Sequence, residues 1–87
     1  MSQKEELISR LKSKPRDFEL RELERLFGFC GCKKSNAGKT SGSAIRYTYV
    51  NGNVKRVFTL HKPHPEKTLK KYVLEAAILF LSEIEEI

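Results

Sequence analysis

The feature that most constrains the fold is a pair of alternating apolar and polar segments, residues 44–50 and 54–61, on either side of an Asn-Gly dipeptide at residues 51–52. A period of two residues is typical of a strand with one buried face. Asn and Gly both tolerate the positive φ that a two-residue hairpin turn requires. The sequence therefore predicts an antiparallel hairpin. Its apolar face carries Tyr47, Tyr49 and Phe58, which we expect to pack under helices rather than to stack on nucleic-acid bases.

Helical periodicity lies on both sides of this hairpin. Apolar residues recur at a spacing of three or four over residues 3–13, 17–27 and 66–83, which predicts three amphipathic helices. Asp17 is the expected N-cap of the second helix, and Gly28 is the expected left-handed residue after its end.

Two shorter segments complete the expected order. Residues 29–33 are predicted to form a short strand, and residues 35–43, rich in Ser and Gly, a loop. The order helix, helix, strand, strand, strand, helix predicts an α+β fold with a three-stranded antiparallel sheet covered on one face by helices. The 87 residues are expected to form a single domain, residues 1–87.

Charge is distributed unevenly along the chain. The formal net charge is +6, and no acidic residue lies between Glu24 and Glu66. We expect the cations of this segment to form one continuous patch, which would attract polyanions, so RNA is the expected ligand. A surface that binds an acidic protein, or a basic face that only favours solubility, would have the same composition.

Composition disfavours other function classes. No apolar run is long enough to cross a membrane, and residues 1–6 are polar, unlike a signal peptide, so we expect a cytoplasmic protein without membrane contact. Cys30 and Cys32 do not make a disulfide framework. With His61 and His64 they would supply four zinc ligands, but this spacing is unlike that of common zinc modules, and we expect no metal and no cofactor.

The order of elements after the first helix resembles that of double-stranded-RNA-binding domains and of small toxins with the same fold. Residues 39–43, the hairpin that follows and residues 60–72 are together similar to the HicA family of toxins from HicAB toxin–antitoxin modules. The resemblance covers residues 17–82 and leaves residues 1–15 as a helical extension. It implies an mRNA interferase, a metal-independent endoribonuclease and thus a hydrolase, which a HicB antitoxin neutralises.

One position departs from the family pattern. HicA-like toxins usually carry Gly-Ser-His, with the histidine regarded as catalytic, whereas this chain has Gly42-Ser43-Ala44. A methyl group cannot transfer a proton. Three interpretations remain open: another group substitutes for the histidine, the protein binds RNA without cleaving it, or the toxin is disabled by a natural or introduced substitution.

His61 and His64 are the candidate substitutes, because they are the two histidines of the chain and imidazole titrates near neutral pH. Lys39, Arg46 and Lys62 would then supply positive charge at the phosphate. Both histidines also have a simpler interpretation, as packing and turn residues at a proline-rich strand end.

RNA binding without catalysis has candidates at the start of the last helix. The free N–H groups and the dipole of a helix start favour an anion, and Lys67, Lys70 and Lys71 lie close by. Ordinary surface lysines would give the same pattern. The full set of candidate RNA-binding residues is Lys39, Ser43, Arg46, Lys62, Lys67, Lys70 and Lys71.

Overall fold

The computed structural model describes residues 3–36, 44–61 and 67–85. Its elements are α1 (Gln3–Lys12), α2 (Leu20–Phe29), β1 (Lys33–Asn36), β2 (Ala44–Asn51), β3 (Val54–His61) and α3 (Lys71–Glu83). Within these ranges the strands form one antiparallel sheet of order β1-β2-β3, and the predicted α+β class and order of elements are confirmed. None of these helices is long and apolar enough to cross a membrane.

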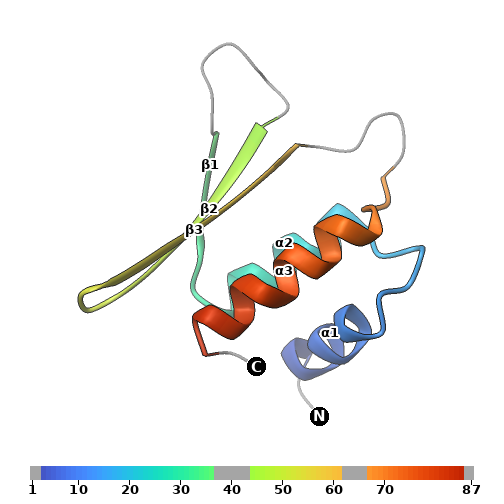
Figure 1. The fold of residues 1–87 in the computed structure, drawn as a ribbon, viewed down its shortest axis with the longest axis horizontal. Coiled ribbons are helices and arrows are strands. Elements are labelled where there is room, and N and C mark those ends of the chain that lie inside the picture. Colours follow the sequence, from blue (N-terminus) through green and yellow to red (C-terminus); the bar gives the residue numbers. More distant parts are fainter. Residues whose placement is uncertain (1–2, 37–43, 62–66, 86–87) are drawn as a thin grey trace.

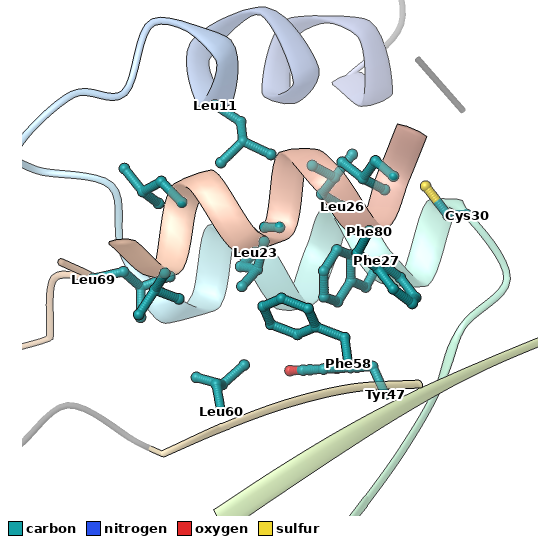
Figure 2. Packing of buried hydrophobic residues seen from close by; sticks show 14 of the residues in the cluster. Leu11, Leu23, Leu26, Phe27, Cys30, Tyr47, Phe58, Leu60, Leu69 and Phe80 are labelled. Atoms are coloured by element: carbon teal, nitrogen blue, oxygen red, sulfur yellow. The ribbon is translucent and has the colours of Figure 1, made fainter. Parts of the chain in front are cut away.

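The molecule is built in layers (Figure 1). The sheet forms the first layer, and α2 and α3 cover one of its faces. The short helix α1 packs against α2 and α3 on the side away from the sheet, with the buried Leu11 pointing into the helix pair (Figure 2). The opposite face of the sheet carries no helix of the described residues.

The hydrophobic core lies between the helix pair and the sheet, with Phe27 of α2 at its centre (Figure 2). The centroid of its ring lies 4.9 Å from that of Tyr47 and 5.3 Å from those of both Phe58 and Phe80. One side chain therefore connects both strands of the hairpin with α3. Tyr47 and Phe58 are buried, which confirms their predicted role in the core, and Tyr49 packs half-buried against the same cluster.

The Tyr47 hydroxyl is buried without a hydrogen-bond partner of good geometry among the described residues. Burial and the nearby carboxylate of Glu24 raise the pKa of Tyr47 above its ordinary value. Because a buried donor without a partner costs about 1–3 kcal/mol, Tyr47→Phe is expected to leave the free energy of unfolding unchanged or to raise it by up to about 1 kcal/mol. Urea denaturation measures this difference. A clear loss of stability would mean that the hydroxyl donates to Glu24 in solution.

The start of α2 differs from the prediction. The helix begins at Leu20, and Glu19 occupies the N-cap position without a side-chain capping hydrogen bond. Asp17, the predicted cap, instead accepts a hydrogen bond of 3.0 Å from Arg10 of α1. The prediction failed because this contact joins two different helices, and no local pattern indicates it.

The segment between α2 and β1 is also shifted relative to the prediction. Gly28 lies inside α2, and the left-handed residue is Gly31, with a φ of +82°. The strand predicted over residues 29–33 is therefore wrong, because β1 begins at Lys33 and takes the first two residues of the predicted loop 35–43. The remainder of that loop lies outside the described residues.

The turn of the hairpin falls one residue later than predicted. Asn51 pairs with Val54, so the turn consists of Gly52 and Asn53, and Gly52 has a φ of +61°. The bounds of β3 agree with those predicted for the second strand of the hairpin, residues 54–61. The register runs without interruption from this turn to the opposite end of the ladder, where Ala44 pairs with His61.

The starts of α2 and α3 are joined by backbone hydrogen bonds. The Leu20 N–H donates to the Lys67 carbonyl at 3.1 Å, and the Leu69 N–H donates to the Phe18 carbonyl at 2.8 Å. Residues 67–69 are therefore held outside the helix, which begins at Lys71 rather than at the predicted residue 66. Since both helices start from this connection, they run in the same direction.

Candidate nucleic-acid interface

The face of the sheet turned away from α2 and α3 is called the open face here. Successive residues of a strand point to opposite faces, and directly opposite residues on paired strands point to the same face. The open face therefore consists of the residues that alternate with the core positions: Lys33, Ser35, Ala44, Arg46, Thr48, Val50, Lys55, Val57, Thr59 and His61. All of them are exposed except Ala44, which is buried, and Thr48, which is half-buried.

The open face combines fixed positive charge with hydroxyl groups. Lys33, Arg46 and Lys55 lie on it, and in the described parts of the chain none of the three forms an ion pair. Hydroxyl groups come from Ser35, Thr48 and Thr59. Lysine, arginine and hydroxyl side chains are the usual donors to phosphate oxygens and sugars of nucleic acids. The face is therefore chemically suited to a phosphodiester backbone.

The acid-free segment does not form one continuous patch. Lys34 points to the helix side of the sheet, where its Nζ atom pairs with the Glu24 carboxylate at 2.9 Å. Arg25 lies on α2, and Arg56 stands opposite Tyr49 and points away from the open face. The prediction of a single surface is wrong for these three cations. Among the described cations of this segment, it holds only for those that alternate onto the open face.

His61 lies next to Ala44, the position at which the resemblance to HicA toxins leads us to expect a histidine. Ala44 and His61 are direct partners in the β2–β3 ladder, so their Cβ atoms are about 4.5–5.5 Å apart. Arg46 lies two residues further along β2 on the same face. The structure thus brings three of the predicted site residues together: Ala44, Arg46 and the exposed His61.

The predicted lysines near α3 do not belong to this group. Lys67 lies in the extended segment before the helix, Lys70 is the N-cap residue, and Lys71 is the first residue of α3. All three are exposed. They form a second cationic region, separate from the sheet. The predicted site residues outside the described ranges are Lys39, Ser43, Lys62 and His64, and their roles stay predictions.

The geometry argues against a zinc site that combines the cysteines with His61. Cys32 precedes Lys33, whose partner Thr48 lies four residues along β2 from Ala44, the partner of His61. At about 3.3 Å per residue this separation is roughly 13 Å, so Cys32 and His61 lie too far apart along the sheet to bind one metal ion. Over the ranges that the structure describes, no cluster of three or more His, Cys, Asp or Glu side chains is placed to hold a metal ion.

Lys33 and the hydroxyl residues of the open face were not among the predicted site residues. The face of the sheet to which Lys33 and Ser35 point depends on where β1 begins and on its register with β2. A strand predicted over residues 29–33 has a different start and therefore could not indicate this face. The alternation of β2 alone would have identified Thr48, because it lies two residues from Arg46.

Comparison with known proteins identifies the family. No curated protein and no solved structure matches the chain. The family model described as HicA toxin of bacterial toxin–antitoxin matches residues 20–80. This region begins with α2, includes the whole sheet and reaches Phe80 of α3, whereas α1 precedes it. Because the match covers well over half of the chain, this protein belongs to the HicA family of bacterial toxin–antitoxin toxins.

Proposed function

We propose that this HicA-family toxin acts on RNA and binds the RNA backbone across the open face of the sheet. The observation that carries the proposal is that Lys33, Arg46 and Lys55 lie on one uncovered face, without ion pairs in the described residues and interspersed with hydroxyls. Such cations release counterions when they neutralise phosphates, which is the main source of affinity for RNA.

An antitoxin is the partner of a toxin of this family. We propose a HicB-type antitoxin that neutralises the toxin by covering the open face. A protein on this face would exclude RNA from Arg46 and His61 together, because both side chains belong to the same side of neighbouring strands.

The proposed reaction is RNA cleavage in the cytoplasm, with His61 in place of the family histidine. The ribose 2′-hydroxyl loses its proton to a base and attacks the adjacent phosphorus, while the bond to the 5′ oxygen breaks and that oxygen receives a proton from an acid. The products are a 2′,3′-cyclic phosphate and a 5′-hydroxyl. His61 would transfer one of these protons, and Arg46 would stabilise the additional negative charge on the phosphate. His64, which lies outside the described residues, stays the other histidine predicted to transfer a proton.

RNA binding without cleavage is the second candidate function, and Ala44 is the observation that favours it. The two functions share the open face and differ only in whether a proton is transferred. Growth arrest and RNA cleavage on expression would support the toxin as an active enzyme. An unaltered protein that binds RNA but leaves it intact would support the second function.

Removing two cations of the open face is expected to weaken RNA binding in a salt-dependent manner. For Lys33→Ala/Arg46→Ala, the slope of log Kobs against log salt concentration should become shallower by about 1.4, since each phosphate contact on a single strand contributes about 0.7. Fluorescence anisotropy with a labelled RNA at several salt concentrations measures the slope.

The matched control is Lys12→Ala/Arg25→Ala, which removes the same charge from exposed positions on α1 and α2. Its slope should remain close to that of the unaltered protein. Equal changes of the slope in both variants would show that the effect depends on the net charge of the protein and not on the open face. Competition by an acidic peptide as strong as that by RNA would contradict the proposal and favour a protein-binding surface.

A further inference from the structure

A second cationic surface is an open cavity of about 550 Å³ between two connecting segments. One wall is formed by residues 13–16, which connect α1 with α2, and the other by residues 68–71, which lead into α3. The side chains relevant to binding are Ser13, Lys14, Arg16, Thr68, Lys70 and Lys71. We call this the connector cavity. The wall from residues 13–16 precedes the region matched by the family, so this site depends on a part of the chain outside that match.

The two walls are held in fixed positions by backbone hydrogen bonds. The second wall is joined to the start of α2 through the Leu69 N–H, which donates to the Phe18 carbonyl at 2.8 Å. The first wall begins at the end of α1, where the Lys14 N–H donates to the Leu11 carbonyl at 2.9 Å. The cations therefore face one cavity without a rearrangement of the backbone.

The acidic residues that follow the first wall in the sequence are engaged elsewhere. Asp17 pairs with Arg10 at 3.0 Å, and Glu19 pairs with Arg21 at 2.9 Å. The first turn of α3 contains no acidic residue. These carboxylates therefore do not neutralise the cavity.

Most of the positive charge of the cavity is unpaired. Lys14 forms an exposed ion pair with Glu75, at 3.4 Å. Arg16, Lys70 and Lys71 form no ion pair within the described part of the chain. Three cations from two separate segments around one cavity, with hydroxyls beside them, match an oxyanion that carries more than one acceptor oxygen.

We propose that the connector cavity binds a phosphate group of the RNA, held by Arg16, Lys70 and Lys71. This inference rests on the proposed function for its ligand and adds a second contact point to it. β3 ends towards the side of the molecule on which α2 and α3 begin (Figure 1), so the end of the open face that carries His61 and the connector cavity lie on the same side of the molecule. The phosphate is either a phosphodiester within the chain or a terminal 5′-phosphate.

Inorganic phosphate tests the cavity without RNA. Titration of the isotope-labelled protein, followed by amide chemical shifts, should give saturable changes concentrated in residues 14–16 and 69–72. Arg16→Ala/Lys70→Ala should abolish these changes, whereas Lys12→Ala/Arg25→Ala should keep them. Changes spread over the whole surface, or concentrated elsewhere, would overturn the proposal.

RNA binding provides the second readout. In Arg16→Ala/Lys70→Ala the slope of log Kobs against log salt concentration should become shallower by about 0.7, the value for one phosphate contact on a single strand. An unchanged slope would overturn the proposal. If the unaltered protein prefers 5′-phosphorylated over 5′-hydroxyl RNA and Arg16→Ala/Lys70→Ala loses this preference, the ligand of the cavity is a terminal phosphate. If the variant binds both RNAs more weakly to the same extent, the ligand is a phosphodiester.

The two readouts separate this inference from the function on which it rests. Localised shifts with inorganic phosphate in a protein that binds no RNA would support the cavity as a phosphate site and refute the proposed function. If Lys33→Ala/Arg46→Ala weakens RNA binding as expected but Arg16→Ala/Lys70→Ala does not, the phosphate site in the connector cavity is refuted and the proposed function is not.

Discussion

Replacing His61 with alanine is expected to lower the rate of RNA cleavage by about 10²–10⁴-fold, the usual contribution of a general acid or base. His61 is exposed and lies at the end of β3, so the substitution should leave the fold intact. Cleavage of a labelled RNA by the purified protein measures the rate, and growth after induced expression gives a second readout. Thermal unfolding followed by circular dichroism confirms that the variant is folded.

The register of the sheet makes a sharper version of this experiment possible. Because Ala44 is the direct partner of His61, the double variant Ala44→His/His61→Ala returns an imidazole to within about 5 Å of its original position, and it should recover cleavage. The matched control is Thr48→His/His61→Ala, which places the imidazole on the same face of β2 but roughly 13 Å away, and it should remain inactive.

Three results would contradict the role of His61. Full activity of His61→Ala would exclude it as the acid or base. Recovery of cleavage in the Thr48→His/His61→Ala control would show that the location of the imidazole on the open face does not matter for cleavage. An unaltered protein that leaves RNA intact and does not arrest growth would refute cleavage altogether. A gain of toxicity on Ala44→His alone would then identify residue 44 as a vacant catalytic position.

Replacing Phe27 with alanine is expected to cause the largest loss of stability, about 3–5 kcal/mol. Its ring contacts Tyr47, Phe58 and Phe80, so the truncation leaves a cavity at the junction of α2, the hairpin and α3. Small domains are stable by only about 5–15 kcal/mol in total, so the variant should be partly unfolded near 37 °C. Urea denaturation followed by circular dichroism measures the difference.

The matched control for this prediction is Phe29→Ala in the same helix. Phe29 is 46% exposed, whereas Phe27 is fully buried, so the control removes the same atoms from a site that water already reaches. We expect a loss of about 1 kcal/mol or less for it. A similar loss in both variants would contradict the central position of Phe27 in the core.

The parts of the fold that the sequence predicts correctly are those that depend on local patterns. Both ends of β3 follow from the alternation of residues 54–61 and from the glycine in the turn. The start of α3 depends instead on a contact between distant segments. Leu69 fits the helical spacing of the apolar residues that follow it, but residues 67–69 pair with residues 18–20, and this long-range pairing overrides the local preference.

The candidate site shows how a small error in a turn conceals a functional relationship. A turn made of Asn51 and Gly52 would place Ala44 opposite Thr59. The observed turn, one residue later, places it opposite His61. The residue types of the site were therefore predictable, but their proximity was not, because it depends on a register that a shift of one turn residue changes.

The aromatic contact between α2 and α3 also has a consequence for synthesis on the ribosome. The core joins Phe27 of α2 to Phe80 of α3, the last helix in the order of elements, so it cannot close while residues of α3 are still inside the exit tunnel. The hairpin alone is a local element of marginal stability. The helix pair and the sheet therefore cannot dock into the finished core until α3 has left the tunnel, so the core of this domain forms late in synthesis, after all of its strands.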